Sequence, residues 1–259
     1  MTPKVLVLRT AGTNCDLETQ FAFEKAGAET TRLHVNLATS TTLKQHQVLV
    51  FPGGFTYGDD ISAGKIMANE VLHRFKEPML RFIEDGKLML GICNGFQILV
   101  KAGLLPALGG YFRRQEVTLA FNDSNRFEDR WICLKPTSKT CVFTKGMEQV
   151  ITLPIAHAEG KFVPANRVVL NTLKKNDRIV FRYVDEKGKA GGFPVNPNGS
   201  IDHIAGVCDK TGRIMGLMPH PERHISYLQN PHHTRKNLPE EGAGMMIFRN
   251  AVQYVRENL

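Results

Sequence analysis

The stretch KLMLGICNGFQIL, residues 87–99, carries the local pattern that decides the fold of this chain. Lys87 to Ile92 is short and apolar, which predicts a buried strand, and the residues from Asn94 onward predict a helix. Cys93 then lies where the strand turns sharply into the helix, between Gly91 and Gly95. Such a corner lifts a side chain out of the sheet, and the helix N-terminus favours the reactive thiolate. We therefore expect Cys93 to be a nucleophile.

The residues before this stretch alternate between strand and helix patterns. Apolar runs that predict strands lie at 4–9, 29–35 and 47–51. Helix-favouring runs lie at 14–26, at 63–75 and from Pro78 to near Gly86, with Asn14 as the expected cap of the first helix. Strands that alternate with helices indicate a parallel sheet covered on both faces.

From Leu104 onward the pattern changes to short segments separated by turn residues, as in antiparallel strands. The expected strands lie at 116–121, 131–135, 150–155, 168–172 and 179–183. Residues 206–208 and 214–218 predict a closing strand pair, and 245–258 predicts a final amphipathic helix. We interpret residues 1–259 as a single α/β domain with a mostly parallel central sheet and a β-rich insertion at approximately 104–155.

The composition argues against several classes of protein. No apolar run reaches the roughly 18 residues of a membrane span, and the N-terminus has no signal-peptide layout, so we expect a cytoplasmic protein. The five cysteines have no CxxC spacing, and His220 and His224 lack a third ligand, so no metal is expected. Apart from Cys93, the cysteines are expected to pack as small hydrophobes. The net charge of +8 is spread along the chain, which does not favour nucleic-acid binding.

A nucleophilic cysteine needs a base and a group that orients this base. Two His-x-Glu pairs are available, His220 with Glu222 and His157 with Glu159, and both follow predicted strands. Ligands of open α/β sheets bind at such strand ends. The spacing does not choose between the two pairs. Prolines on both sides of His220 stiffen its backbone, which favours His220 weakly.

The glycine-rich segment FPGGFTYGDD, residues 51–60, also follows a predicted strand. A backbone N–H of Gly53 or Gly54, together with that of Asn94, could hold a developing oxyanion, although a plain tight turn is the alternative. Gln97 lies one helical turn after the cysteine, so its amide could contact the polar end of a substrate.

The motifs FPGGF (51–55), GICNGFQ (91–97) and PHPE (219–222) occur together and in order, and the chain resembles the class I glutamine amidotransferases. Within that family, the motifs CNGFQ, FTYGD, AHAEG and NDSNRFEDRW are similar to those of the glutaminase subunits of phosphoribosylformylglycinamidine synthases. The general family prefers Leu and His where this chain has Asn94 and Phe96. The change at Asn94 should not affect the mechanism, because that position contributes a backbone N–H.

The resemblance implies a flavodoxin-like, three-layer α/β/α sandwich and a thioester mechanism. Cys93 would attack the side-chain amide of L-glutamine and form a γ-glutamyl thioester. His220 would transfer the proton and Glu222 would orient His220. The resemblance also implies a supporting role for His157 and Glu159, near the site or at a subunit interface.

The resemblance further implies partners. Ammonia would pass to a separate synthetase subunit, which would use ATP and magnesium to convert formylglycinamide ribonucleotide to formylglycinamidine ribonucleotide in purine biosynthesis. A small third subunit would bridge the two, and this chain would need no cofactor, membrane or nucleic acid. Two alternatives remain open: a glutaminase for another acceptor, and a non-catalytic stress protein with the same cysteine corner. The latter class usually lacks the PHPE pair.

Overall fold

A nine-stranded sheet runs through the computed structural model, which describes all residues from 1 to 259. The five strands of its parallel part are, in spatial order, β2 (Glu29–His34), β1 (Lys4–Arg9), β3 (Val48–Phe51), β4 (Leu88–Ile92) and β11 (Ile214–Leu217). Every residue of β3, β4 and β11 is buried, as expected for parallel strands covered on both faces.

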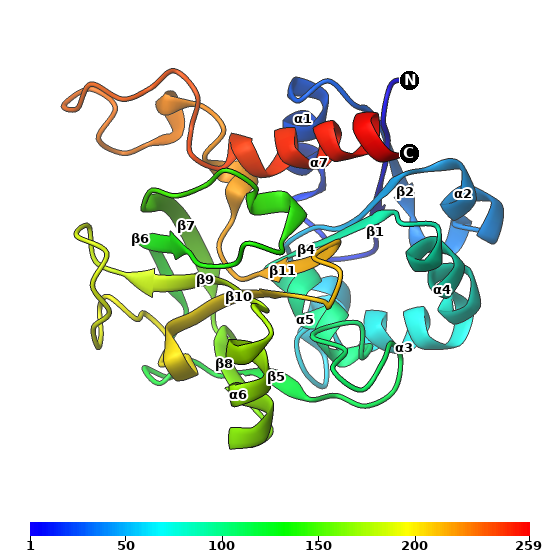
Figure 1. Cartoon of the computed structure of the whole chain (residues 1–259), viewed down its shortest axis with the longest axis horizontal. Helices are drawn as coiled ribbons and strands as arrows, with labels where there is room; N and C mark the ends of the chain where they lie inside the picture. Colours follow the sequence, from blue (N-terminus) through cyan, green and yellow to red (C-terminus); the bar gives the residue numbers. More distant parts are fainter.

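Helices cover both faces of this parallel part, which confirms the predicted α/β class (Figure 1). The helices of this half are α1 (Asp16–Lys25), α2 (Ser40–Gln45), α3 (Lys65–Arg74), α4 (Lys76–Glu84), α5 (Asn94–Lys101) and α7 (Met245–Asn258). Helices α1 and α7 lie together on one face, where the rings of Phe23 and Phe248 meet edge to face with centroids 5.0 Å apart. Helix α5 packs on β3, β4 and β11 from the other face, and all eight of its residues are buried.

The β-rich part continues the same sheet. Its strands are β10 (Ile204–Cys208), β9 (Ile179–Val184), β6 (Glu128–Pro136) and β7 (Ile151–His157), added antiparallel after β11. Two further strands, β5 (Val117–Ala120) and β8 (Lys161–Pro164), form a separate pair. These strands extend from residue 117 to residue 208, beyond the expected range of 104–155. A single cluster of 63 buried hydrophobic residues draws on both halves.

Two local predictions were wrong. The strand expected at 168–172 is part of helix α6 (Arg167–Lys175), because the side chain of Asn166 accepts a hydrogen bond from the Val169 N–H and caps the helix start. Val169 and Leu173, four residues apart, are then its buried residues. Asn14 does not cap α1: Cys15 holds that position and makes no side-chain capping bond.

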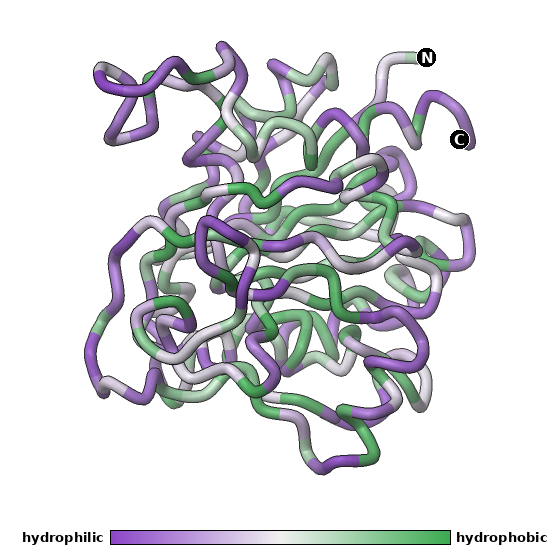
Figure 2. Tube along the Cα trace, turned by 60° about the vertical axis from the view of Figure 1, so that its left-hand side comes forward, coloured by the Kyte–Doolittle hydropathy of each residue, from purple (hydrophilic) through white to green (hydrophobic).

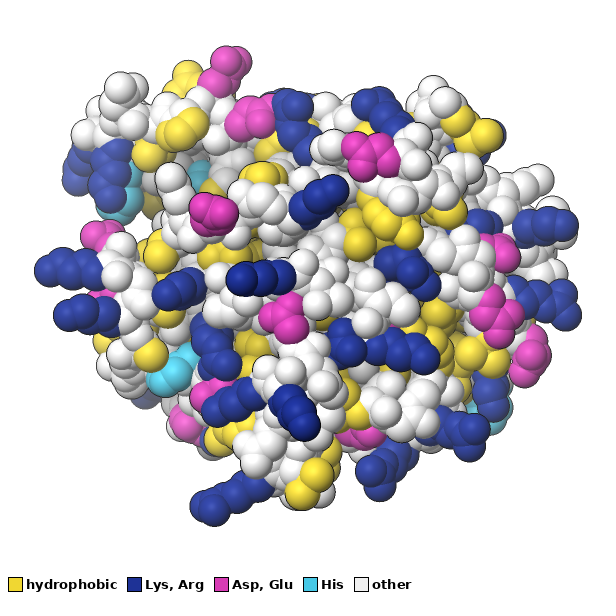
Figure 3. All heavy atoms as spheres, viewed as in Figure 1, with side chains coloured by type: hydrophobic (Ala, Val, Ile, Leu, Met, Phe, Trp, Pro, Cys, Tyr) yellow, Lys and Arg dark blue, Asp and Glu magenta, His cyan; other side chains and the backbone are white.

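The remaining short 3-10 helices lie at Val35–Leu37, Thr56–Asp59, Val142–Thr144, Ile201–His203, Pro221–Arg223 and Tyr227–Gln229. Apolar residues lie mostly in the central part of the molecule, and polar residues lie mostly in the outer loops (Figure 2). Lysine and arginine side chains are scattered over the visible face rather than gathered in one patch (Figure 3). None of the helices combines the length and apolar composition that crossing a bilayer requires.

Candidate active site

Cys93 lies at the sharp turn between β4 and α5. Its backbone has φ 52° and ψ −104°, a strained combination for a residue with a side chain. Glycine is required on both sides, because a Cβ on Gly91 would lie 2.6 Å from the carbonyl oxygen of Gly95, and one on Gly95 would lie 1.8 Å from that of Phe51. The predicted sharp turn from strand to helix at Cys93 is therefore present, built by close packing of α5 against the sheet.

His220 and Glu222 reach the same edge of the sheet from the end of β11, the strand next to β4. Nδ1 of His220 lies 2.6 Å from Oε1 of Glu222, and both side chains are almost fully buried. The backbone N–H of His220 donates to the carbonyl of Pro154 in β7, which fixes the residue from a second strand. Nε2 of His220 is buried and has no hydrogen-bond partner within the chain. Of the two His-x-Glu pairs, 220/222 thus has the geometry of a base with its orienting carboxylate.

Opposing effects act on the charge of His220. Burial alone would lower its pKa, but the Glu222 carboxylate and then the nearby Cys93 outweigh burial and raise the pKa well above its usual value. The histidine therefore favours the imidazolium form beside the sulfur of Cys93. An imidazolium is the proton donor that a leaving amine needs.

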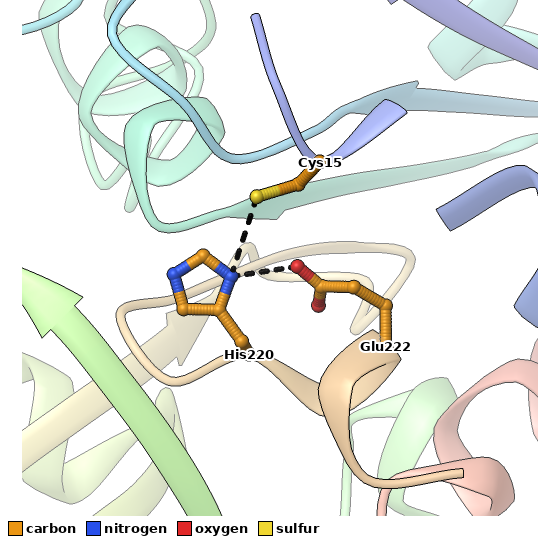
Figure 4. Close-up of side chains that lie close together, drawn as sticks. All are labelled: Cys15, His220 and Glu222. Atoms are coloured by element: carbon orange, nitrogen blue, oxygen red, sulfur yellow. Dashed lines mark hydrogen bonds and ion pairs between the residues drawn. The ribbon is translucent and has the colours of Figure 1, made fainter. Parts of the chain in front are cut away.

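Cys15 is a third neighbour of His220 that the sequence did not indicate (Figure 4). Its Sγ lies 3.8 Å from Nδ1 of His220, accepts a hydrogen bond from Arg223 at 3.2 Å and donates one to Asn14 at 3.1 Å. Burial above all raises the pKa of the Cys15 thiol to about 12, so Cys15 remains a protonated thiol. Cys15 was expected to pack as a plain small hydrophobe, and these polar contacts correct that expectation.

The Cys15 sulfur, Nδ1 of His220 and the Glu222 carboxylate are atoms of the kind that bind zinc, and they lie within 4.8 Å of one another. Nδ1 of His220 is committed to Glu222, which competes with any metal. The other histidine of the metal-like spacing, His224, is not in this cluster, and its Nδ1 donates to the carbonyl of Thr152 at 2.7 Å.

The two glycines after β3 have different surroundings. A Cβ on Gly53 would lie 2.7 Å from Cε1 of His220, so this glycine leaves room for the imidazole. Gly54 lines a small cavity beside Cys93, whereas the N–H of the next residue, Phe55, is already donated within the chain. The N–H of Asn94 belongs to the first turn of α5, where it has no helical partner. Gly54 and Asn94 are thus better placed than Gly53 to hold an oxyanion.

The side chain of Asn94 does more than the sequence indicated. Its Oδ1 accepts hydrogen bonds from the backbone and the hydroxyl of Thr56, at 3.2 and 2.8 Å, and its Nδ2 donates to Asp59 at 3.0 Å. Asp59 makes one of these contacts, and Tyr57 lies between the two contact residues. The backbones of both Tyr57 and Asp59 have positive φ angles near 55°. Asn94 therefore fastens a strained loop beside Cys93.

The AHAEG motif forms the other wall of the cavity. The Cys93 sulfur lies 3.8 Å from the carbonyl oxygen of Ala156, and Nε2 of Gln97 donates to the carbonyl of Glu159 at 2.6 Å. Oε1 of Gln97 also accepts a hydrogen bond from Nδ2 of Asn94. The amide of Gln97 thus links helix α5 on one side of the cavity to the AHAEG motif on the other. Substrate contact by Gln97 stays a prediction, since one N–H and one lone pair remain. The cavity between the walls measures about 50 Å³.

Buried and partly buried charges lie beside this cavity. Nζ of Lys101 lies 3.9 Å from the Glu159 carboxylate and also donates to the carbonyl of Ala63 at 2.5 Å. Burial, followed by the charge of Glu159, raises the pKa of Asp59 to about 6. Two carboxylates, those of Asp59 and Glu159, thus line the cavity, and the Lys101 ammonium lies behind them against Glu159, which gives the cavity a polar character suited to an amino acid.

Comparisons with known proteins agree with this geometry. The family model for CobB/CobQ-like glutamine amidotransferase domains matches residues 2–255. The phosphoribosylformylglycinamidine synthase subunit PurQ of Dehalococcoides mccartyi is 48% identical over 259 residues, covering 98% of each chain. PurQ of Archaeoglobus fulgidus is 44% identical over 269 residues, covering 98% of this chain and 97% of that protein. A solved structure of PurLQS from Thermotoga maritima contains a chain with TM-score 0.75 and 30% identity, covering 98% of this chain and 100% of that chain.

Proposed function

This chain belongs to the family of CobB/CobQ-like glutamine amidotransferase domains, and we propose that Cys93, His220 and Glu222 carry its release of ammonia from glutamine. It is a glutaminase of the PurQ type, an enzyme of purine biosynthesis. One observation carries the assignment of residues. His220 is buried, its Nδ1 is held by Glu222, and its Nε2 has no hydrogen-bond partner within the chain. It lies near Cys93, whose backbone has a strained conformation at the turn between β4 and α5.

In the proposed reaction, the proton of the Cys93 thiol has passed to Nε2 of His220 before the attack, so that His220 is the imidazolium and Cys93 the thiolate. The Cys93 sulfur then attacks the side-chain carboxamide carbon of glutamine. The N–H groups of Gly54 and Asn94 stabilise the oxyanion of the tetrahedral intermediate, and one such donor contributes about 3 kcal/mol in other hydrolases. The C–N bond then breaks, and His220 returns the proton to the leaving nitrogen, which departs as ammonia. Water, activated by His220, hydrolyses the γ-glutamyl thioester and releases glutamate.

We propose that the ammonia passes to a synthetase subunit, since the similar chain in the Thermotoga maritima structure is part of PurLQS. The exposed rings of Phe55 and Phe127, whose centroids are 6.3 Å apart, are a suitable docking surface, because Phe55 also lines the Cys93 cavity. Ammonia leaving the cavity would then enter the partner without crossing open water. A small third subunit would bridge the two proteins.

The acceptor chemistry belongs to the partner in this proposal. The synthetase would bind ATP and magnesium and convert formylglycinamide ribonucleotide to formylglycinamidine ribonucleotide. This chain needs no cofactor for its own half-reaction, because thiol, imidazole, carboxylate and backbone N–H groups supply every proton and charge. Its cysteines are free thiols, as suits the cytoplasmic location that we propose.

A labelling experiment tests the assignment. We expect a chloroketone analogue of glutamine to alkylate a single residue, Cys93, and we expect excess glutamine to block this reaction. The labelling is carried out on the chain assembled with its synthetase, and peptide mapping by mass spectrometry then identifies the adduct. The matched control is Cys15→Ser, which keeps Cys93 and should still be labelled. An adduct on Cys15 in the unmodified chain would overturn the assignment.

A further inference from the structure

The amide of Asn122 holds His157 in one orientation. Nδ2 of Asn122 donates to the carbonyls of Arg126 and His157, at 2.9 and 2.8 Å. Two donated bonds fix which end of the amide is nitrogen, so Oδ1 is the acceptor end. This oxygen accepts from the backbone N–H of Gly160 at 3.1 Å and lies 3.2 Å from Nδ1 of His157.

This arrangement fixes the tautomer of His157. An acceptor opposite Nδ1 requires a hydrogen on Nδ1, so the proton of the neutral imidazole is on that nitrogen. Burial, followed by the nearby His220, lowers the pKa of His157 to about 3, and the ring stays neutral at physiological pH. Nε2 of His157 therefore carries a lone pair and can only accept a hydrogen bond.

The imidazole of His157 cannot turn to find another partner. A Cβ on Gly160 would lie 2.1 Å from Cε1 of the ring, so the backbone of the same motif presses against one side of it. His157 is 3% exposed, and its Nε2 has no hydrogen-bond partner within the chain. A buried acceptor without a partner is costly, and such groups in native proteins need an explanation.

His157 also lines the small cavity that contains Cys93 and Gly54. We propose that Nε2 of His157 accepts a hydrogen bond from an N–H of the substrate carboxamide and afterwards from the ammonia formed from it. This inference rests on the proposed glutaminase function and assigns His157 the task of selecting the amide. A carboxylate has no N–H to donate and would place its own lone pairs against Nε2, so the same group disfavours the product glutamate.

Two substitutions separate this role from a purely structural one. In the His157→Asn variant, the new side-chain amide can still donate a hydrogen bond to Oδ1 of Asn122, but it has no atom at the position of Nε2. Gln in His157→Gln is long enough to place a carbonyl oxygen there. We expect His157→Asn to lower kcat/KM for glutamine about tenfold or more, because the N–H of the bound substrate then has no hydrogen-bond acceptor. His157→Gln should recover part of that loss.

The second substrate is glutamate γ-methyl ester, whose reacting group has a carbonyl but no N–H. His157→Asn should change kcat/KM for the ester less than twofold, measured as glutamate release by the chain assembled with its synthetase. An equal loss with glutamine and ester would show that His157 only supports the fold, and would overturn the inference. If the unmodified chain hydrolysed neither substrate, the glutaminase assignment itself would fail. Circular dichroism and the melting temperature establish that each variant is folded.

Discussion

The buried pair of His220 and Glu222 makes the stability of the protein depend on pH. The folded-state pKa of His220 is raised well above 6.5, chiefly because Glu222 outweighs the effect of burial. A histidine with a raised pKa contributes stability that is fully present below its unfolded-state pKa. This contribution is lost as the pH rises through the folded-state pKa.

We therefore predict a pH-dependent effect of Glu222→Gln on the free energy of unfolding. Removing one partner of a buried ion pair costs up to about 3–5 kcal/mol. The difference from the unmodified protein should be largest at pH 6, where the imidazolium is present, and should narrow towards pH 9. Urea unfolding at the two pH values measures it, and the exposed Glu148→Gln is the control. A difference that does not change with pH would contradict the ion pair.

The residues of the site differ in how far the sequence could predict them. Cys93 could be singled out because it lies between two glycines at the end of an apolar strand run. His220 and Glu222 could be preferred to His157 and Glu159 only weakly from the residues, and it was the resemblance carried by the PHPE motif that pointed to them. Cys15 could not, since its donor Arg223 is 208 positions away along the chain. Its place in the connection between β1 and α1, next to the segment that follows β3, can be recognised only once the sheet order is known.

At the level of elements, the contact between helix α5 and the loop at 56–59 is held by one side chain, that of Asn94. We predict that Asn94→Leu lowers the free energy of unfolding by about 1–3 kcal/mol, because Thr56 and Asp59 lose their partner. The same variant should slow alkylation of Cys93, since Gly54 lies at the start of this loop. Urea unfolding and the rate of labelling measure the two effects.

The control for this prediction is Asn171→Leu, which makes the same change on the exposed surface of helix α6. It should affect neither measurement. An Asn94→Leu variant as stable and as reactive as the original protein would show that position 94 contributes only its backbone N–H, as the sequence alone suggested.

The elements themselves were largely predictable where hydrophobic periodicity is strong. Strands β1, β3 and β4 are continuous apolar runs, and their alternation with helices predicted the parallel sheet. Helix α6 was misread because a short run of Val and Leu fits a strand and a helix equally well. Its capping residue, Asn166, was the available signal.

For the molecule as a whole, the cavity beside Cys93 opens next to a pair of exposed aromatic side chains. The single sheet brings Cys93 and His220 to one edge, and the exposed Phe55 lies at the cavity there. Phe127, from the segment before β6, lies beside Phe55. Exposed aromatic rings are enriched at protein interfaces, where they bury much apolar area. No local pattern could predict this pairing, because it depends on how the β-rich half joins the sheet.

We predict that Phe127→Asp weakens binding to the synthetase subunit about 30-fold or more, as loss of a central aromatic contact does at other interfaces. A carboxylate at this position would have to be desolvated when the partner docks, which adds to the loss. Isothermal titration calorimetry with the synthetase measures the affinity. Labelling of Cys93 in the free chain should stay unchanged, because Phe127 does not line the cavity.

The matched control is Phe21→Asp, which places the same charge on the exposed side of α1 and should bind the synthetase normally. Equal binding by both variants would place the partner on another face.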